Sequence, residues 1–443
     1  ADLIDPREQI GGMAATRWVE GLPLKAGIHL LHPSRDPLRA LAEELVGLMG
    51  DKALRVHPRA AIRFLGQDLS YPFKSRELAR ALGPQRLAAV VASALEARAR
   101  TTLDAARARV LGDTSPSAPD SFETVVRAAY GDHFYKLFFR DYTAKVLGLP
   151  AEQVSGTWAR RRVPMPSGAH LLQTLLPWWR PKALEHPHSP FHRAQVTGPD
   201  GMGALFEAML HEGAAPARLD LGSELVGVDL GDEGVAHVRI KDATGTERRS
   251  TTRHLISTMP LPSLVDRIHP RLPSPILDAA KRLRFRGITY VFVVLRGAPL
   301  FKAQWTYHQD PGRCFNRLSE FGNFLPDLYG PERTVVCAEI TSDPGEETWE
   351  NDEATIARCL ADLDAVSPRP LGAAVEACVV RREEHAYPAW RVGLEEDLRA
   401  VLNAIDSIPG LITVGRQGRY DYLNIDEAVA AGLGAADRVL RRD

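Results

Sequence analysis

The chain has 443 residues, a length that exceeds one ordinary domain. Of these residues 44% are hydrophobic and 25% charged, which is typical of a folded globular protein. Its 55 basic and 56 acidic side chains leave a formal net charge of -1, which argues against a general nucleic-acid-binding protein because phosphate backbones favour a basic excess. The four cysteines form no C-x-x-C pair, which argues against a zinc site or a disulfide framework.

The cysteines are typical of buried thiols in a reducing compartment. The sequence has no apolar run of 18 or more residues and no signal peptide, features that membrane spans and secretion require. We therefore expect a cytoplasmic protein. The stretch LLPWWRP, with Trp178 and Trp179, could contact a membrane, but it is more typical of a domain interface.

Residues 1–32 alternate short apolar runs with glycine, which predicts strands and tight loops. The stretch DPLRALAEELVGLMG then has the spacing of a helix, and AAIRFLGQDLSYPF predicts a hairpin. Residues 75–147 are rich in helical patterns, whereas residues 148–200 are rich in proline and aromatic residues.

A compact helix, GMGALFEAMLHEG, leads into residues 218–257, where Gly, Asp and Thr break three or four strands of a small antiparallel meander. Strands dominate residues 285–380, and the tail predicts a strand, a Gly-containing loop and a final helix.

Nucleotide-type signals therefore lie at both ends and in the middle of the chain. We predict an α/β fold: a discontinuous, N-terminally truncated Rossmann-like domain for FAD, with a helical insert and a sheet-rich substrate domain. The predicted boundaries are 1–60, 196–275 and 391–443 for the FAD domain, 61–195 for the helix-rich insert and 276–390 for the mixed sheet.

Three stretches could carry the chemistry. Asp5 ends an apolar strand and precedes a Gly pair, so its carboxylate could bind ribose hydroxyls, although an Asp before Pro is also typical of a turn. LKAGIHLLHP places His29 where an imidazole could touch a planar ring, or where it is an ordinary strand–turn residue.

The tail VGRQGRYDYLNIDEAVAAGL is the third stretch and the strongest of the three. A Gly loop after an apolar strand leads to a helix that begins near Asn424 to Asp426. The free N–H groups of such a helix end can hold a phosphate or a carbonyl oxygen. The alternative is an ordinary capped C-terminal helix.

Together these stretches resemble the FAD-dependent amine oxidase and protoporphyrinogen oxidase-like superfamily, which includes the UDP-galactopyranose mutases. LIDPREQIGGMAAT resembles the acidic strand end followed by R-x-G-G, and GIHLLHP resembles the mutases' G-x-H-x-x-H. SYPFK, FFRDYTAKVLGLPAEQVSGTWARRRV, GPDGMGALFEAM, HLISTMPL and the tail follow in the expected order, so the resemblance spans the chain.

The resemblance implies FAD as the cofactor and a role for each matching position. Asp5 would bind the adenosine ribose, and the backbone of Leu225 would meet adenine. The remaining cofactor positions are Gly11, Gly12 and Met13 along the pyrophosphate and flavin, Gly27, Ile28 and His29 against the isoalloxazine, Gly415 and Arg416 near the ribityl phosphate, and the backbone N–H groups of Asp426, Glu427 and Ala428 at the flavin pyrimidine edge.

Four features depart from the family pattern. Gln9 replaces an Arg, Lys25 stands where an acidic residue is common, and Ile28 stands where the oxidases often have Gly. The family's roughly 30-residue strand, Gly-rich loop and helix would precede Asp5, and the sequence begins at Ala1 without Met. We expect that this front was lost, and that the polypeptide as written binds FAD weakly or not at all because a helix end that neutralises the pyrophosphate is missing.

The leading hypothesis is an FAD-dependent oxidoreductase that removes a hydride from a small-molecule substrate and passes electrons to O₂ or another acceptor. His29 is the candidate catalytic residue. Predicted substrate residues are Arg161, Arg286, Tyr307, Tyr387 and Trp390.

Two alternatives stay open. A mutase-like enzyme would use reduced flavin as a nucleophile on a nucleotide sugar, with arginines from Arg160, Arg161, Arg162 and Arg286 on the diphosphate. A flavin-free, degenerate relative would serve as a scaffold, and the intact tail loop argues against it.

Overall fold

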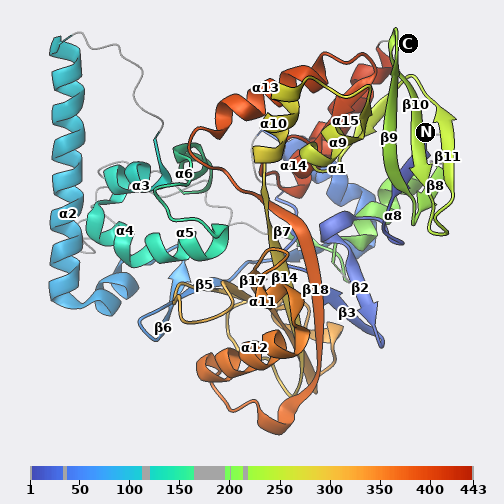
Figure 1. Cartoon of the computed structure of the whole chain (residues 1–443). Coiled ribbons are helices and arrows are strands. Elements are labelled where there is room, and N and C mark those ends of the chain that lie inside the picture. The colour runs from blue at the N-terminus through green and yellow to red at the C-terminus, as the bar shows by residue number, and fades with distance from the viewer. Residues whose placement is uncertain are drawn as a thin grey trace.

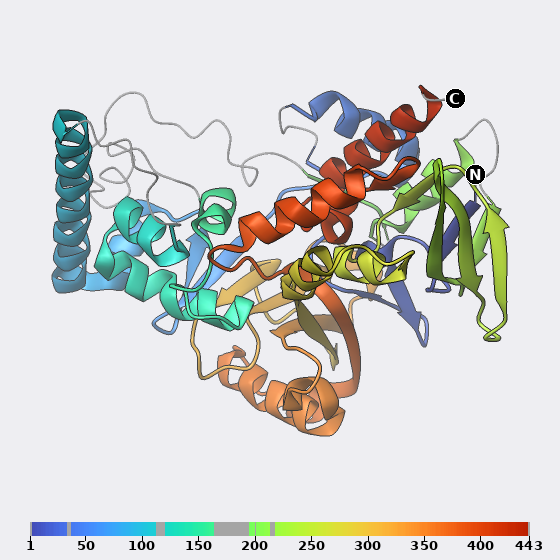
Figure 2. The same cartoon turned by 45° about the horizontal axis from the view of Figure 1, so that its top comes forward.

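The computed structural model describes residues 2–32, 37–111, 120–163, 195–199, 201–212 and 218–441. Three regions lie side by side in both views: helices at one edge, a large sheet below the middle, and a region of smaller sheets and helices that holds both chain ends (Figures 1 and 2). Trp178 and Trp179 lie outside the described residues. Within the described part of the chain, no helix combines the length and apolarity needed to cross a bilayer.

The large sheet has seven strands. In spatial order its strands are β18 (Val375–Pro388), β14 (Phe285–Arg296), β17 (Arg333–Thr341), β16 (Arg317–Glu320), β15 (Trp305–His308), β5 (Ala60–Phe64) and β6 (Gln67–Tyr71). β15 and β5 are parallel, and the other neighbours are antiparallel.

The apolar run of β14 is buried on both faces of this sheet. Because successive side chains of a strand point to opposite faces, Tyr290 and Phe292 join one core cluster whereas Val291 and Val293 join another. Helix α12 (Asp352–Val366) contributes Cys359 to the second cluster, and the short α11 (Glu347–Glu350) precedes it.

The expected helix-rich stretch is present. Its helices are α2 (Ser75–Leu111), α3 (Phe122–Tyr130), α4 (Asp132–Phe138), α5 (Arg140–Leu147) and α6 (Gly156–Arg162). Gly83 has a φ of 68°, outside the helical region, and precedes Pro84, so α2 is kinked there. The stacked rings of Phe64 and Phe138 join these helices to the hairpin β5–β6.

The region with the chain ends contains the parallel strands of the Rossmann-like domain. β1 (Asp2–Asp5) is parallel to β8 (Arg218–Leu221), and β12 (Leu255–Ser257) is parallel to β19 (Leu411–Thr413). The meander consists of β9 (Glu224–Gly231), β10 (Gly234–Lys241) and β11 (Glu247–Thr251), with β13 (Ile268–His269) parallel to β9.

The helices of this region are α1 (Arg39–Met49), α8 (Gly203–His211), α9 (Leu261–Arg267), α10 (Ser274–Arg282), α13 (Leu394–Asp406), α14 (Gly415–Gly418) and α15 (Ile425–Leu440). Two further strand pairs are the hairpin β2 (Thr16–Val19) with β3 (Leu22–Lys25), and β4 (Leu54–Val56) with β7 (Gln195–Thr197).

The predicted hairpin of residues 60–71 is confirmed, but it extends the large sheet through the β5–β15 pairing. It therefore joins the strands of the predicted substrate domain rather than standing with the helical insert alone. The predicted domain boundaries themselves stay predictions.

Candidate functional site

The tail loop and the N-terminal turn meet in space. The Gln417 side-chain amide lies 3.7 Å from the Met13 sulfur and donates to the His385 carbonyl at 3.1 Å. Ile425, at the start of α15, packs in the same cluster as Leu31 and Met202. Residues near 13, 31, 202, 417 and 425 therefore converge, as one extended cofactor site requires.

His29 lies in a strongly positive environment. Burial lowers its pKa from 6.5 to about 3, and the charges of Arg416, Arg317 and Arg381 act in the same direction. These surroundings favour the neutral imidazole at physiological pH.

Gly27, with a φ of 80°, lies against a buried ion pair. A Cβ added there would lie 3.5 Å from Arg317 Nη2 and 3.7 Å from Glu339 Oε1. Arg317 Nε and Nη2 each donate to one oxygen of Glu339 at 2.7 Å. The pair is bidentate, the strongest arrangement of these two groups, and it fixes the wall beside His29.

Asp5 ends β1 as predicted and also forms a local turn, while its contact with the ribose stays a prediction. Its Oδ1 accepts a hydrogen bond from the Arg7 backbone N–H at 2.8 Å, which is the local turn. Its backbone carbonyl accepts from Ser223 N at 3.1 Å, which brings β1 to the end of β8.

The backbone carbonyl of Leu225 already accepts one hydrogen bond within the chain. The donor is Arg267 Nε at 2.7 Å, and Leu225 pairs with Ile240 across β9 and β10. The contact of the Leu225 backbone with adenine stays a prediction.

The Gly pair forms the expected tight turn before Met13. Gly11 has a φ of 100° and Gly12 a φ of 56°, conformations that side chains rarely adopt. A Cβ on Gly11 would lie 2.6 Å from the Phe206 ring, so this glycine is required for packing against α8. A Cβ on Gly12 would meet only the Arg7 guanidinium, at 3.5 Å.

The start of α15 corrects one prediction. The Ala428 N–H donates to the Asn424 carbonyl at 2.9 Å, because α-helical bonding begins there. Asn424 and Glu427 form a capping box. Ala428 therefore offers no free N–H to a cofactor. Asp426 is fully buried, and neither of its carboxylate oxygens has a hydrogen-bond partner in the described chain.

Arg416 follows Gly415 in the tail loop, and its guanidinium donates hydrogen bonds to backbone carbonyls. Its Nη2 donates to the Leu423 carbonyl at 2.7 Å, and its guanidinium lies 4.2 Å from the Tyr422 ring centroid. The Arg162 guanidinium lies 3.8 Å from the same ring. Tyr422 is thus held between two cations.

Half-buried tyrosines gather around these cations. The rings of Tyr387 and Tyr422 are parallel at 6.1 Å, and Tyr307 makes edge contacts with Tyr71 at 5.8 Å and Tyr142 at 6.2 Å. Electrostatic interactions of Arg317 with Tyr307 and Tyr387 connect the two groups of rings. We call this set the tyrosine–arginine cluster; it comprises Tyr71, Tyr142, Tyr307, Tyr387, Tyr422, Arg162, Arg317 and Arg416.

The cluster shifts the acidity of its phenols in two directions. Burial raises the pKa of Tyr71 to about 12, with a further contribution from Tyr307. Burial alone would also raise the pKa of Tyr422, but Arg162 and Arg416 lower it below its usual value. Tyr422 is therefore the more acidic hydroxyl of the two.

Three predicted substrate residues lie outside the cluster. Arg286 is buried in ion pairs with Glu346 and, at 2.7 Å, with Asp343. Arg161 pairs with Asp421 near the surface, and Trp390 is a buried member of a core cluster. Tyr307 and Tyr387 are in the cluster as predicted.

Arg162, and not the predicted Arg161, belongs to the cluster for a geometric reason. Consecutive residues of a helix point about 100° apart, so only one of the adjacent arginines at the end of α6 can face Tyr422. The motif ARRRV indicated the right segment but could not select the residue.

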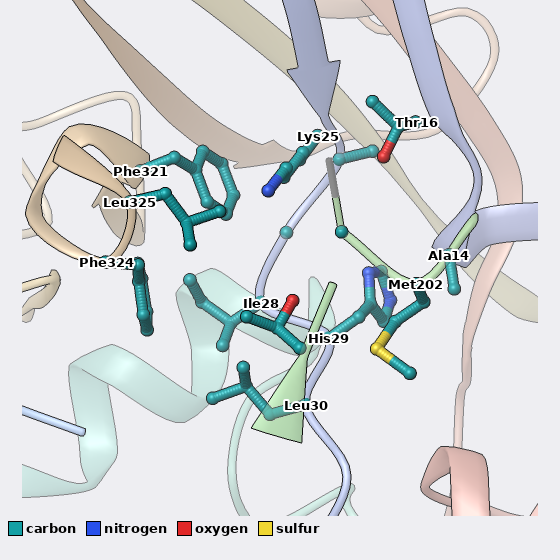
Figure 3. Close-up of a pocket in the computed structure, with 14 residues that line it drawn as sticks. Ala14, Thr16, Lys25, Ile28, His29, Leu30, Met202, Phe321, Phe324 and Leu325 are labelled. Atoms are coloured by element: carbon teal, nitrogen blue, oxygen red, sulfur yellow. The ribbon is translucent and has the colours of Figure 1, made fainter. Parts of the chain in front are cut away.

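A pocket lies along the segment from Lys25 to Leu30 (Figure 3). In the close-up, the apolar side chains of Phe321, Phe324 and Leu325 lie on one side and those of Ala14 and Met202 on the other. The Lys25 ammonium lies 5.4 Å from the Phe321 ring centroid. The segment predicted to meet the flavin therefore lines an apolar recess on one side and contacts the Arg317–Glu339 pair through Gly27.

The fold and the convergence of these segments are those of an FAD-dependent oxidoreductase. The family model for flavin-containing amine oxidoreductases matches residues 2–440, so the chain belongs to that family. The residues at the site fit FAD: the tight turn of Gly11 and Gly12 leads to Met13, which contacts Gln417 of the tail loop, and His29 lines the recess along residues 25–30.

Solved structures have the same fold at low identity. Reduced UDP-galactopyranose mutase is 18% identical with a TM-score of 0.80, over 100% of this chain and 90% of that chain. A structure from Exiguobacterium sp. 255-15, assigned as a protoporphyrinogen oxidase, is 17% identical with a TM-score of 0.71, over 100% and 93%. A putrescine oxidase variant is 14% identical with a TM-score of 0.60, over 99% and 93%.

Several residues of the site were missed by the sequence analysis. Arg317 and Glu339 face each other across β16 and β17, and no local motif marks a cross-strand pair. Tyr71 and Tyr422 do lie in the quoted stretches SYPFK and GRYDYLN, so proximity to a family motif was the signal that could have identified them.

Proposed function

We propose that this protein removes a hydride from a C–H bond of a small molecule bound at the tyrosine–arginine cluster, next to nitrogen, oxygen or a conjugated system. The observation that carries the proposal is the adjacency of two surfaces. Gly27 and His29 belong to the segment that the family resemblance assigns to the flavin, and they lie beside Arg317, a member of the cluster.

FAD, when bound, supplies the hydride acceptor. Asp5, the turn at Gly11–Met13, the segment Gly27–His29 and the start of α15 would hold it. His29 stays neutral, so it can orient a substrate or cofactor by a hydrogen bond without first losing a proton. Met13 and Gln417 would join the two ends of the site through their contact.

The substrate side can hold and polarise a small molecule. Parallel rings of Tyr387 and Tyr422 offer flat apolar surfaces. Arg162 and Arg416 lower the pKa of the Tyr422 hydroxyl, so its phenolate is a candidate acceptor for the proton that a substrate heteroatom loses when the hydride leaves.

The test is anaerobic reduction of the FAD-loaded protein. Amines, alcohols and partly reduced conjugated rings would be added in turn while the visible absorption of the flavin is followed. Bleaching by one class identifies the substrate. Peroxide formation on readmission of air supports O₂ as acceptor, and reoxidation only by an added dye supports another acceptor. No bleaching by any class would contradict the proposal.

A second candidate is rearrangement of a nucleotide sugar. It is favoured by Arg162 and Arg416, which have no carboxylate partner within the described residues. Such cations suit a diphosphate. This candidate predicts that a UDP-sugar binds and that an isomeric product forms only after dithionite reduction. Product formation without net oxidation would favour this rearrangement over the proposed hydride removal.

A further inference from the structure

Two of the four cysteines lie against each other beside helix α12. Cys314, in the loop between β15 and β16, is half-buried, and Cys359 of α12 is fully buried; both are free thiols. Their side chains belong to one apolar cluster on one face of the large sheet. A hydrogen bond to Cys314, and then burial, raise the pKa of the Cys359 thiol well above its usual range. The two sulfur atoms are therefore neighbours in the folded chain.

A single carboxylate fixes the Cys314 loop to helix α12. Asp362 accepts hydrogen bonds from the Cys314 backbone N–H at 2.8 Å, from Arg313 Nη1 at 3.2 Å and from Arg358 Nε at 2.9 Å. Asp362 follows Cys359 by three positions, so both side chains lie on the same face of α12. The loop is thus held where the Cys314 side chain meets Cys359.

The two thiols differ in their access to solvent. Cys314 is partly exposed, whereas Cys359 has no exposed surface. Lys145 and Arg358 interact electrostatically with Cys314, as cations do beside reactive cysteines. An oxidant from solution therefore reaches Cys314 first, and Cys359 is in place as the second thiol, the arrangement of cysteines that oxidise reversibly.

The other two cysteines are less suitable partners. Cys378 of β18 packs against the same cluster, but its effect on the pKa of Cys359 is smaller than that of the hydrogen bond to Cys314. Cys337 belongs to the core cluster that contains Phe292, on the other face of the sheet. Cys314 and Cys359 are therefore the pair that the fold brings together.

We propose that Cys314 and Cys359 form a disulfide when the reduced protein meets hydrogen peroxide. The Cys314 sulfur attacks the peroxide, so that an S–O bond forms, the O–O bond breaks and one water leaves. The Cys359 sulfur then attacks the Cys314 sulfur: an S–S bond forms, the S–O bond breaks and a second water leaves. The thiol protons leave in the waters, and the peroxide takes up the two electrons that the thiols lose.

This disulfide would act on a segment that joins two strands of the candidate site. Residues 309–316 connect Tyr307 of β15 to Arg317 of β16, and both of these residues belong to the tyrosine–arginine cluster. Oxidation would tie the connecting segment covalently to α12. The inference does not depend on the proposed hydride transfer, because the peroxide is added as a reagent.

The experiment uses the full chain, reduced, freed of reductant and treated with a small molar excess of hydrogen peroxide. Free thiols are then alkylated under denaturing conditions and counted by intact mass. Cross-linked peptides are identified after cleavage before aspartate, because Asp362 separates Cys359 from Cys378 in that digest. Cys314→Ser and Cys359→Ala test the pair, and Cys378→Ser is the matched control from the same cluster. Circular dichroism verifies that each variant is folded before treatment.

The free thiols of the parent should fall from four to two, and one cross-linked peptide should join Cys314 to Cys359. Dithiothreitol should restore all four thiols. Cys378→Ser should form the same cross-link. Cys359→Ala should form none, and its Cys314 should be labelled by dimedone as a sulfenic acid. Cys314→Ser should keep its three thiols.

Three outcomes would overturn the inference. The first is a parent that keeps all four thiols or loses only one. The second is a cross-link from Cys314 to Cys378, or between two chains, in place of the Cys314–Cys359 bond. The third is an equal loss of thiols in the parent and in folded Cys359→Ala, which would show that Cys359 takes no part in the oxidation.

Discussion

The two sides of the candidate site, for cofactor and for substrate, consist of different structural elements. The cofactor side consists of backbone turns, glycines and the start of a helix, drawn from residues 5–29 and 415–428. The substrate side consists of long side chains from strands and helix ends, held by ion pairs and ring contacts. The cofactor side is therefore marked by local sequence, whereas the substrate side depends on which strands become neighbours.

The sides also differ in how their charges are satisfied. On the substrate side Arg317 is neutralised by Glu339, and Arg381 shares Glu383 with Arg7. On the cofactor side Asp426 has no partner in the described chain.

The largest expected effect comes from breaking the charge pair of the substrate side. Glu339→Gln leaves the Arg317 guanidinium in the protein interior without a counter-charge. We expect a loss of about 3–5 kcal/mol in the free energy of unfolding, measured with urea.

Glu384→Gln is the control, since Glu384 is exposed on strand β18 of the same sheet, and it should change stability by less than about 0.5 kcal/mol. A loss below about 1 kcal/mol for Glu339→Gln would show that the pair contributes less than other buried ion pairs.

The second prediction concerns Arg162, one of the two cluster arginines that have no carboxylate partner within the described residues. Arg162→Ala removes a guanidinium that contacts Tyr422 and Trp158 but no carboxylate of the described chain. We expect binding of inorganic pyrophosphate, measured by calorimetry, to weaken at least about tenfold, as for loss of a charge-assisted hydrogen bond.

Arg160→Ala is the matched control for that measurement. Arg160 lies in the same helix and is paired with Asp120, so pyrophosphate binding should be unchanged. Equal affinities in the parent and Arg162→Ala would remove the main support for an anionic substrate and leave the oxidation of a neutral molecule.

The third prediction follows from the neutral state of His29. Its folded pKa of about 3 is lower than the unfolded value of 6.5, so between these values the unfolded chain binds one proton more than the folded chain. His29 therefore reduces stability progressively as the pH falls below 6.5, with a slope of up to about 1.4 kcal/mol per pH unit.

Replacing His29 by Gln should remove that slope. The difference in unfolding free energy between the parent and His29→Gln is measured with urea at several pH values between about 5.5 and 4. His57→Gln, at an exposed position, should leave the slope of the parent unchanged. A parent slope that persists in His29→Gln would mean that other groups cause the acid sensitivity.

Local patterns predicted the parts of the fold that depend on neighbouring residues. The hairpin at 60–71, the meander and the final strand–loop–helix all form where periodicity and glycines indicate them. The parallel pairings of β1 with β8 and β12 with β19 confirm the Rossmann-like class. The resemblance to the family predicted FAD as the cofactor, because the family's motifs are continuous in sequence.

The substrate side resisted prediction for a physical reason. Arg317 and Glu339 are 22 positions apart and meet only through the register of β16 and β17. Arg286 was expected to be available but is held by Asp343 and Glu346, residues beyond the next strands. Register and ion-pair choice depend on the whole sheet, which no short motif encodes.

The smallest expected effect compares two helix caps, one on each side of the site. Asn351 caps α12 beneath the sheet, where its side chain accepts from Ala354 N at 3.0 Å, and Asn424 caps α15 on the cofactor side. Replacing either by Ala should cost about 1 kcal/mol of stability without ligand. The two variants should therefore be nearly indistinguishable by urea unfolding.

The two variants should differ in their affinity for FAD. Fraying of the first turn of α15 displaces the backbone N–H groups of Asp426 and Glu427 that the resemblance assigns to the flavin, so Asn424→Ala should weaken FAD binding by about two- to fivefold, the equivalent of about 0.5–1 kcal/mol. Asn351→Ala should leave the FAD affinity unchanged, because α12 packs against the part of the sheet that holds no cofactor residue. Equal FAD affinities in both variants would mean that the start of α15 is only a structural helix end, and the contrast between the two sides would then lose its strongest element.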